Sequence, residues 1–463
     1  MNEFANIFKA YDIRGLVDVE IDVDFTFATG VAFARFLQIE REPGTIVIGE
    51  DMRLSSSPLA DAFSAGVNSQ GMDVVRIGLA STDMLYFASG KLGLPGAMFT
   101  ASHNPAEYNG IKLCFSGARP IGKESGLVRI EDFVREGSPI ALRNVGVEKQ
   151  RNMLEEYVDY LLTLVDLKSI HPLKIIVDAG NGMAGFTAPA VMERLNIDLI
   201  PMYFELDGNF PNHEANPIEA KNLKDLQKRV KKEKADIGLA FDGDADRLGV
   251  VTKDGQVIFP DRQMMLFAKD VLSRHPKGQI IYDVKCTRNL APWIEQHGGQ
   301  ALMWKTGHSL VKAKLKETGA PLAGEMSGHI FFKDRWFGFD DGLYTGARLL
   351  EILSKVANPS EVLNALPNAI CTPELQLPCA EGESFLLLEK IKANPQFPSS
   401  QSINTIDGVR VEYADGFGLA RPSNTTPIVV LRFEADSDEA IKRIQGEFKK
   451  ALLAVKPDAK LPF

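Results

Sequence analysis

Hydrophobic residues occur along the chain mostly in short runs, each followed by a polar or glycine-bearing loop and then by residues with helical spacing. This alternation continues through the first three quarters of the sequence and is typical of α/β architecture. Three runs are alike, because each has the pattern of a buried strand that ends in an acidic residue; they lie at 45–53, 173–181 and 279–287. Their separation is that of a domain, far longer than a solenoid repeat of roughly 20 to 50 residues. The pattern therefore predicts three related α/β domains.

The pattern changes after Pro367, where strand-like segments become adjacent. The expected strands lie at 374–377, 409–413 and 428–433, and the expected helices at 383–391 and 438–455. This order predicts a small α+β domain at the C-terminal end. Polar stretches that we interpret as linkers lie at 137–151, 252–261 and 358–372. We accordingly expect four domains, with the bounds 1–147, 148–254, 255–366 and 367–463.

Length and composition fit a multidomain globular protein. The 463 residues, 45% of them hydrophobic, are enough to bury several cores. The net charge of −9 argues against binding to nucleic acid or to an anionic membrane. The four cysteines have neither disulfide nor metal-ligand spacing, and no apolar run has the length of a membrane span or of a signal-peptide core. We expect a soluble, cytoplasmic protein.

The first candidate for chemistry is Ser102, in a Thr-Ala-Ser-His-Asn-Pro segment that directly follows an apolar run. A strand that runs into this segment leaves a hydroxyl on a tight loop at the carboxyl edge of a sheet, where the sites of α/β proteins usually lie. Lys112 and Arg14 are nearby sources of positive charge. Taken alone, a Ser-His pair is more often a turn than a nucleophile.

Three alternating aspartates, Asp242, Asp244 and Asp246, follow a second apolar run. Three negative charges on one loop destabilise it unless a cation neutralises them. Magnesium is suited to this role, because it needs few protein oxygens and completes its shell with phosphate oxygens. An EF-hand would have glycine and glutamate where this chain has Arg247 and Lys253. An aspartyl-phosphate phosphatase would have a small residue in place of Asp246, so the pattern favours a magnesium site.

The loop Gly180-Asn-Gly-Met-Ala-Gly185 matches the dinucleotide-binding fingerprint. A lone match of this kind is weak evidence, and a tight turn between a strand and a helix is the favoured interpretation. Glu205 and Asp207 nevertheless lie at about the distance expected for a ribose-binding acid. A NAD-dependent dehydrogenase therefore stays open as a hypothesis.

Two later loops are rich in hydrogen-bonding groups. In the Gly-Glu-Met-Ser-Gly-His segment, Glu325 and Ser327 suit a vicinal pair of sugar hydroxyls, and His329 is placed to relay a proton. In the Arg-Pro-Ser-Asn-Thr-Thr segment that begins at Arg421, the side chains other than proline can all donate hydrogen bonds, and none is acidic. Such loops are typical of phosphate sites. Plain turns are the alternative for both segments.

With these segments in this order, the chain resembles the α-D-phosphohexomutase superfamily over essentially its whole length, and most closely the bacterial phosphomannomutase/phosphoglucomutase enzymes. The resemblance implies three α/β domains and a C-terminal α+β domain around a central cleft. It implies one loop per domain, in the order phosphoserine, metal, sugar and phosphate, and a structural role for the Gly180 loop. One departure is Ala245, where relatives often carry glycine.

The resemblance also implies the chemistry: reversible phosphoryl transfer between C6 and C1 of mannose and glucose phosphates, through a phosphoserine and a hexose 1,6-bisphosphate that also acts as activator. The implied catalytic residues are Ser102, Arg14, His103, Lys112, Arg247 and His329. The implied ligands of Mg²⁺ are Ser102, Asp242, Asp244 and Asp246. The implied substrate-binding residues are Tyr11, Lys285, His308, Glu325, Ser327, Arg421, Ser423, Asn424 and Thr425.

Three other functions compete with this one. A phosphoglucosamine mutase resembles the chain too, but its sugar loop is similar to Gly-Glu-Gln-Ser-Gly, and Met326 argues against it. A dehydrogenase leaves the three aspartates unexplained. A non-enzymatic scaffold gives no reason for the polar loops. We expect a monomer whose partners are its hexose phosphate substrates.

Overall fold

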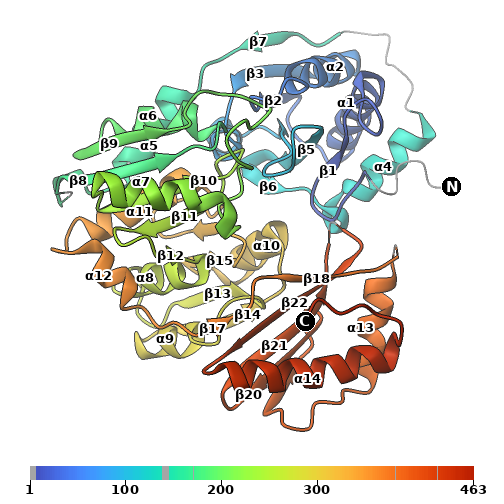
Figure 1. The fold of residues 1–463 in the computed structure, drawn as a ribbon. Helices are drawn as coiled ribbons and strands as arrows, with labels where there is room; N and C mark the ends of the chain where they lie inside the picture. The colour runs from blue at the N-terminus through green and yellow to red at the C-terminus, as the bar shows by residue number, and fades with distance from the viewer. Residues whose placement is uncertain (1–6, 138–144, 170, 381, 425) are drawn as a thin grey trace. The chain divides into compact units, whose positions relative to one another are not determined.

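The computed structural model describes residues 7–463, apart from 138–144, 170, 381 and 425 (Figure 1). These residues form two compact units. The first unit takes in the chain up to Pro260 and the segment Ser327–Ala365, and the second takes in Asp261–Met326 and Leu366–Phe463. The chain therefore leaves the first unit and returns to it before ending in the second.

The first unit begins with a mixed sheet in which β2 is central and parallel to both of its neighbours, β3 and β4. Its strands, in spatial order, are β1 (Ile13–Leu16), β5 (Tyr108–Phe115), β4 (Gly96–Phe99), β2 (Thr45–Glu50), β3 (Asp73–Leu79) and β7 (Glu148–Gln150), with β6 (Arg119–Pro120) beside β5. The helices in this part of the chain are α1 (Val23–Ile39), α2 (Ser56–Ser69), α3 (Thr82–Leu92) and α4 (Leu127–Glu136).

Local sequence explains how α1 and α2 pack together. The Asp22 side chain accepts a hydrogen bond from the Phe25 amide at 2.7 Å and so caps the start of α1. A Cβ atom at Gly30 would lie 2.3 Å from the Phe63 carbonyl oxygen, and one at Gly66 would lie 2.2 Å from that of Phe27. The two glycines therefore allow a backbone contact that no other residue permits, and this brings the apolar faces of both helices over the sheet.

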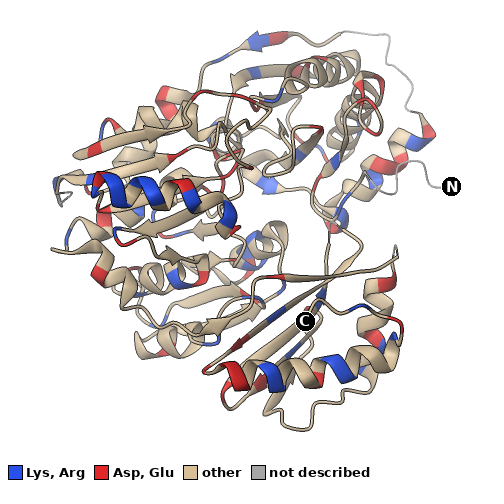
Figure 2. Cartoon of the chain, in the orientation of Figure 1, with Lys and Arg blue, Asp and Glu red and all other residues tan. Residues whose placement is uncertain are grey.

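A second sheet in the first unit is built around β8 and β10, which are parallel to each other. Its strands, in spatial order, are β12 (Val257–Ile258), β11 (Leu248–Thr252), β10 (Ile237–Phe241), β8 (Leu173–Asp178) and β9 (Ile197–Met202). The remaining elements of the unit are α5 (Leu154–Thr163), α6 (Ala184–Met192), α7 (Lys224–Glu233), β16 (Ile330–Phe332), α11 (Gly342–Leu353) and α12 (Pro359–Asn364). Figure 2 shows α7 as a strongly basic surface helix.

The second unit combines a parallel and an antiparallel sheet. In the parallel one, β13 (Gln279–Asp283) lies between β14 (Gln300–Trp304) and β15 (Leu322–Gly324). The antiparallel strands, in order, are β17 (Ile370–Cys371), β22 (Ile428–Ala435), β21 (Gly416–Pro422), β20 (Val409–Tyr413) and β19 (Ser402–Asn404), and β18 (Leu375–Pro378) also pairs with β22. The helices are α8 (Pro260–Leu272), α9 (Leu290–Gln296), α10 (His308–Thr318), α13 (Glu383–Ala393) and α14 (Asp438–Val455).

The three similar segments predicted from the sequence are confirmed as strands: β2, β8 and β13 each have parallel neighbours and end at an acidic residue. The strand at 409–413 and the helix at 438–455 are confirmed with the predicted bounds. The predicted linkers at 252–261 and 358–372 contain the boundaries between the two units, which fall after Pro260 and after Ala365. They are not free of secondary structure, because β12 lies in the first stretch and α12 and β17 lie in the second. In 137–151, residues 138–144 lie outside the described residues and β7 belongs to the first sheet.

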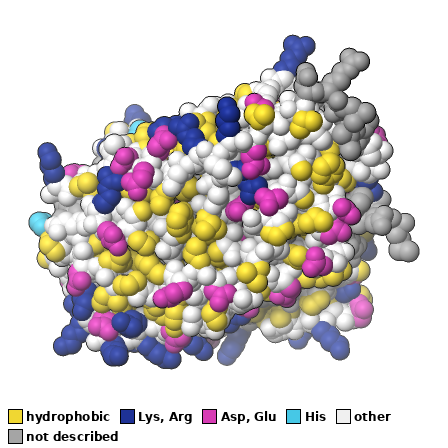
Figure 3. All heavy atoms as spheres, turned by 90° about the horizontal axis from the view of Figure 1, so that it is seen from above, with side chains coloured by type: hydrophobic (Ala, Val, Ile, Leu, Met, Phe, Trp, Pro, Cys, Tyr) yellow, Lys and Arg dark blue, Asp and Glu magenta, His cyan; other side chains and the backbone are white. Residues whose placement is uncertain are grey.

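Two surface features complete the fold. None of the helices in the described part of the chain is long and apolar enough to cross a membrane. On the face seen in Figure 3, acidic and basic side chains are interspersed with hydrophobic ones.

Candidate active site

Ser102 lies on the loop that leaves β4, and its backbone is held in an uncommon conformation. Its φ of 51° falls in the left-handed region, which is unfavourable for a residue other than glycine. The Ser102 amide donates to the Thr100 hydroxyl at 2.9 Å, and the Ser102 carbonyl accepts from Arg53 Nη2 at 2.9 Å. Such strain persists only where surrounding contacts enforce it, and it is typical of functional loops.

Arg53, just beyond β2, enforces this conformation and was missed by sequence reasoning. Its buried guanidinium donates to four backbone carbonyls of the loop. These are the carbonyls of Ser102 (2.9 Å), Asn104 (2.7 Å), Pro105 (2.7 Å) and Tyr108 (3.0 Å). Asp51 accepts from Arg53 Nε at 3.2 Å and holds the guanidinium in place. The signal in the sequence is the pair of charged residues at the end of a strand too apolar to leave them on the surface.

The three aspartates of the second motif lie between β10 and β11 and are almost completely buried. One ligand oxygen from each lies within 4.8 Å of the others, as a single cation requires. Asp244 Oδ1 is buried and has no hydrogen-bond partner among the described residues. Burial and the neighbouring Asp246 and Asp244 raise the pKa of Asp242 well above its ordinary value. The set is therefore short of positive charge and fits a divalent cation.

Ser102 meets this cluster directly. Its hydroxyl lies 3.0 Å from Asp242 Oδ2 and 3.2 Å from His103 Nδ1. Desolvation, with Arg247 and Arg14 nearby, lowers the pKa of His103 well below its ordinary value, so this imidazole is neutral near pH 7. The structure thus joins two motifs that lie 140 residues apart in the sequence.

Two of the predicted cations also lie at the aspartates. Lys112, on β5, is 2.6 Å from Asp244 and 2.7 Å from Asp246. Burial alone would lower the pKa of Lys112, but these two carboxylates raise it well above the ordinary value. Burial would likewise raise the pKa of Asp244, yet the charge of Lys112 holds it below the ordinary value. Arg247 Nε lies 3.4 Å from Asp242 Oδ2, so Arg247 also faces the cluster.

Arg14 and Tyr11 come from the segment at the start of the first sheet. Arg14, on β1, donates to Asn104 Oδ1 at 3.0 Å and pairs with Asp12 at 2.5 Å, which connects it to the Ser102 loop. Tyr11 is partly buried and precedes β1.

His329 also belongs to the first unit. It precedes β16, and its Nδ1 lies 2.9 Å from Asp340 Oδ2 and 3.5 Å from Asp246 Oδ1. Ser327, two residues earlier, opens the segment of the first unit that carries it.

A second buried pair of carboxyl groups lies further into the first unit. Asp83, near the start of α3, and Asp341, which caps α11, both accept a hydrogen bond from the Tyr157 hydroxyl, at 3.3 and 3.0 Å. Burial and the charge of Asp341 raise the pKa of Asp83 well above its ordinary value. Burial raises the pKa of Asp341 to about 6. Both carboxyl groups therefore bind a proton more readily than an ordinary aspartate does.

The second unit contains the remaining predicted residues, and Thr306 connects several of them. The Thr306 amide donates to Asp407 at 2.9 Å, its hydroxyl donates to Asp283 at 2.8 Å, and its carbonyl accepts from Asn424 at 3.2 Å. Arg421 donates from Nε to the same Asp407 oxygen at 2.9 Å. The loop after β14 is thereby tied to the loop after β21.

The sugar-loop residues of this unit have fixed partners too. Glu325 accepts from the Gly307 amide at 2.5 Å, directly before His308, the first residue of α10. Lys285, after β13, is 2.7 Å from Glu374. The terminal loop needs one correction: Arg421 lies on β21 itself, and not in a loop between strands as the sequence suggested. Ser423 and Asn424 follow the strand, and Thr425 lies outside the described residues.

Comparison with known proteins decides the family. Models of the phosphoglucomutase/phosphomannomutase family match the chain in four consecutive parts: alpha/beta/alpha domains I, II and III at residues 5–139, 155–255 and 259–370, and the C-terminal domain at residues 374–451. The chain belongs to the phosphoglucomutase/phosphomannomutase family. It is accordingly an isomerase of the mutase type.

Relatives in this family are similar over their full lengths. A phosphoglucomutase of Neisseria meningitidis is 49% identical over 453 residues, 97% of each chain. A phosphomannomutase/phosphoglucomutase of Pseudomonas putida is 47% identical over 462 residues, 99% of this chain and 98% of its own. The solved structure of a phosphoglucomutase/phosphomannomutase family protein from Burkholderia thailandensis is 50% identical, covers 100% of both chains and has a TM-score of 0.93.

Within a phosphoglucomutase/phosphomannomutase fold, the Gly180 loop has a packing role that explains its glycines. A Cβ atom at Gly182 would lie 2.8 Å from the Gly243 carbonyl oxygen, and one at Gly185 would lie 2.1 Å from that of Phe204. Gly182 therefore lets the loop lie against the aspartate loop, and Gly185 lets it lie against the segment after β9, at distances that side chains would prevent. This contact favours the structural interpretation over the dehydrogenase hypothesis.

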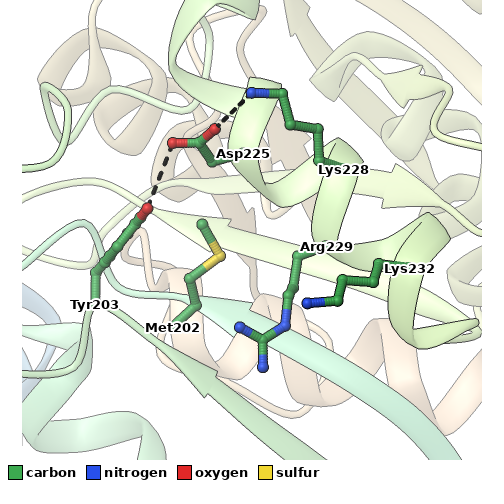
Figure 4. Close-up of a pocket in the computed structure, with 6 residues that line it drawn as sticks. All are labelled: Met202, Tyr203, Asp225, Lys228, Arg229 and Lys232. Carbon is green, nitrogen blue, oxygen red and sulfur yellow. Dashed lines mark hydrogen bonds and ion pairs between the residues drawn. The ribbon is translucent and has the colours of Figure 1, made fainter.

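A groove elsewhere in the first unit contains none of the predicted site residues (Figure 4). It has a volume of about 200 Å³ and lies beside β9 and α7; the residues that line it are Met202, Tyr203, Asp225, Lys228, Arg229 and Lys232. Lys228 is 3.1 Å from Asp225, and Arg229 is 3.0 Å from Glu233. Because these two cations are already paired with carboxylates, the groove gives little reason to expect an anionic ligand.

Proposed function

We propose that the protein transfers a phosphoryl group reversibly between C6 and C1 of mannose and glucose phosphates, with Ser102 as the phosphorylated residue. The observation that carries this proposal is the contact between the Ser102 hydroxyl and Asp242 in a cluster of three buried aspartates. The three aspartates outnumber the two cations beside them, Lys112 and Arg247, so a divalent cation next to Ser102 would be favourable. This environment suits phosphoryl transfer, which depends on positioning and charge neutralisation.

Asp242, Asp244 and Asp246, together with Ser102, are the residues that would hold Mg²⁺. When bound, the ion neutralises the charge that develops on the transferred phosphoryl group. Lys112 and Arg247 supply permanent positive charge to the same place, since both lie beside the aspartates. His103 is neutral near pH 7 and lies at the Ser102 hydroxyl, which suits a residue that orients the phosphoryl group.

The transfer exchanges one phosphorus–oxygen bond for another. The bond between phosphorus and Ser102 Oγ breaks as a sugar hydroxyl oxygen bonds to the phosphorus, and His329 accepts the proton of that hydroxyl. The product is a hexose 1,6-bisphosphate, and the Ser102 oxygen, which leaves as an alkoxide, takes a proton from solvent to become a hydroxyl while His329 releases its proton to solvent. The sugar then turns, and its other phosphate returns to Ser102 in the reverse reaction. A bisphosphate from solution can restore phosphoserine in the same way, so it acts as an activator.

The second unit would supply most of the residues that bind the substrate. Arg421 supports this role, because its buried Nη2 has no hydrogen-bond partner among the described residues while Asp407 fixes the opposite side of the guanidinium. An anion with several oxygens, such as phosphate, would satisfy that donor. In our proposal Ser423, Asn424 and Thr425 complete the phosphate site, and Glu325 with Ser327 holds sugar hydroxyls. The further substrate-binding residues are Lys285, His308 and Tyr11.

We also propose a cytoplasmic monomer with the four domains 1–147, 148–254, 255–366 and 367–463. These bounds follow from the sequence pattern and leave one proposed functional loop in each domain.

The test combines intact mass with a coupled assay on glucose 1-phosphate and mannose 1-phosphate, with and without the matching 1,6-bisphosphate. We expect wild type to gain one phosphoryl group from the bisphosphate and to use both sugars, because a site that binds only the shared hydroxyls cannot strongly reject either epimer at C2. Ser102→Ala should gain none and lose turnover, whereas Ser69→Ala, at the end of α2, should behave as wild type. Full turnover of Ser102→Ala would refute the proposal.

A further inference from the structure

A contact between α3 and the aspartate loop has no role in the chemistry described above. Thr82, the first residue of α3, donates from its hydroxyl to Asp244 Oδ2 at 2.6 Å. Its backbone amide donates to the Asp244 carbonyl at 3.1 Å. Both residues are completely buried, although they lie 162 residues apart in the sequence. Thr82 therefore holds both the backbone and the side chain of the same aspartate.

The two oxygens of the Asp244 carboxylate have different surroundings. Oδ2 accepts from the Thr82 hydroxyl and from Lys112 Nζ, each at 2.6 Å. Oδ1 is buried and has no hydrogen-bond partner among the described residues. A carboxylate oxygen has about two lone-pair sites, so the two donors fill those of Oδ2 and leave those of Oδ1 open. Oδ1 is therefore the oxygen of Asp244 that is available to a cation.

Thr82 is better suited than Lys112 to fix the orientation of this carboxylate. Rotation about the last side-chain bond of an aspartate has only broad preferences, so a carboxylate without a fixed donor can turn. The Lys112 ammonium ends a flexible side chain and is shared with Asp246, 2.7 Å away. The threonine side chain is short and β-branched, which restricts its χ1 angle. The hydrogen bond from its amide to the Asp244 carbonyl also fixes its backbone, so the Thr82 hydroxyl is the fixed donor.

We propose that Thr82 is a positioning residue for the cation: its hydroxyl fixes the Asp244 carboxylate so that Oδ1 stays available to Mg²⁺. This inference rests on the cation site proposed above. A group that hydrogen-bonds to a metal ligand orients that ligand, and its removal typically lowers metal affinity by about 10- to 100-fold. Because the hydroxyl acts on Asp244, its removal should weaken the binding of the cation more than that of the sugar phosphate.

Thr82→Val tests the role of the hydroxyl, because valine keeps the size and the branching of the side chain. Mn²⁺ is the probe, since it also prefers oxygen ligands and its free fraction is measured directly by electron paramagnetic resonance. We expect the Kd for Mn²⁺ to rise by about 10- to 100-fold in Thr82→Val. Thr82→Ser keeps the donor and should bind Mn²⁺ as wild type does. Ser102 must be in the same phosphorylation state in all samples, as measured by intact mass.

Activity gives a second readout. In Thr82→Val the Mg²⁺ concentration for half-maximal activity should rise by a factor similar to that of the Kd, whereas KM for glucose 1-phosphate at saturating Mg²⁺ should change little. Thr29→Val is the matched control: Thr29 is equally buried, in α1, and its hydroxyl donates to the Phe25 carbonyl of the same helix at 2.8 Å. This control should bind Mn²⁺ as wild type does.

The failure of this inference and that of the proposed cation site are distinguishable. A wild-type protein that binds no Mn²⁺ would refute the cation site. If wild type binds Mn²⁺ and Thr82→Val binds it equally well, the inference is overturned. It is also overturned if Thr82→Ser or Thr29→Val loses as much affinity as Thr82→Val. Thr82→Ala lacks the hydroxyl too, and the same loss of affinity is expected for it, so it replaces the valine variant if that protein does not fold.

Discussion

Gly243 gives the sharpest test of the contact between the Ser102 loop and the aspartate loop. It lies between Asp242 and Asp244, and a Cβ atom there would be 2.3 Å from the Ser102 carbonyl oxygen. The aspartate loop cannot move away from Ser102, because it packs against the Gly180 loop. On its other side, a Cβ at Gly182 would be only 2.8 Å from the Gly243 carbonyl, and the Met183 amide donates to that same carbonyl at 2.8 Å. Gly243→Ala must therefore push the two loops apart.

The size of the effect follows from the distances. Ordinary van der Waals contact of a Cβ begins near 3.4 Å, so relief of the overlap at 2.3 Å requires a shift of about 1 Å between Ser102 and the aspartates. A misplacement of about 1 Å costs about 10²-fold in rate, which corresponds to about 3 kcal/mol. Crowding in a well-packed region also destabilises the fold by about 1 to 3 kcal/mol.

The measurements are kcat/KM in the coupled assay and the free energy of unfolding in urea. Gly346→Ala, in α11, is the control, because its Cβ would meet nothing closer than Phe241 Cζ at 3.5 Å and alanine favours a helix by up to about 1 kcal/mol. We expect this control to keep wild-type activity and to be slightly more stable. A Gly243→Ala protein with kcat/KM within twofold of wild type would show that the two loops do not have to touch for the reaction.

Three further predictions concern the cation, the phosphate site and the buried carboxyl pair. Treatment with a chelator should abolish activity and added Mg²⁺ should restore it; full activity in a metal-free sample would refute the cation site. Arg421→Ala should raise KM by about 10- to 100-fold with a smaller loss of kcat, while Arg443→Ala, at an exposed position of α14, should change neither. The Asp341 pKa of about 6 lies above the ordinary 3.8, so the folded state binds the extra proton and stability falls by up to about 3 kcal/mol as pH rises from 4 through 6. Asp83→Asn removes the negative charge beside Asp341. The free energy of unfolding of this variant, minus that of wild type, should therefore increase as pH rises from 4 through 6. If this difference does not change with pH, the account is wrong.

Strands whose residues are almost all buried were predicted well from the sequence, whereas a strand that contains several glycines was not. The strands β2, β8 and β13 were predicted because strands covered on both faces are almost uniformly apolar. The strand β21 was missed, since its sequence Gly-Phe-Gly-Leu-Ala-Arg-Pro reads as a loop. Its glycines serve packing: a Cβ at Gly418 would be 2.3 Å from the Phe448 ring of α14. A pattern of hydrophobic positions does not identify a strand residue that must be glycine because a neighbouring side chain occupies the space of its Cβ.

In the candidate site, too, the residues of local motifs were predicted, and residues that act on distant parts of the chain were not. Ser102 and the three aspartates were found because each motif is contiguous in the sequence. Arg53, Asp407 and Thr306 were missed because each acts on a loop that lies far away along the chain. Arg53 reaches carbonyls about 50 residues later, and the Thr306 amide reaches Asp407, 101 residues later. Only the folded chain brings such partners together, and their side chains carry no local motif.

The division of the chain into two units also separates the proposed roles. Ser102, Lys112, the aspartates, Arg247 and His329 all belong to the first unit, whereas Lys285, His308, Glu325 and Arg421 belong to the second. The boundary falls within one short motif, between Met326 and Ser327, so Glu325 and His329 are only four residues apart and still belong to different units. If these residues have the roles proposed for them, substitutions of the catalytic residues in the first unit should lower kcat, and substitutions of the substrate-binding residues in the second should mainly raise KM. Glu325 accepts from the Gly307 amide of its own unit, so a substitution of Glu325 should change the binding of the sugar more than the reacting groups of the first unit.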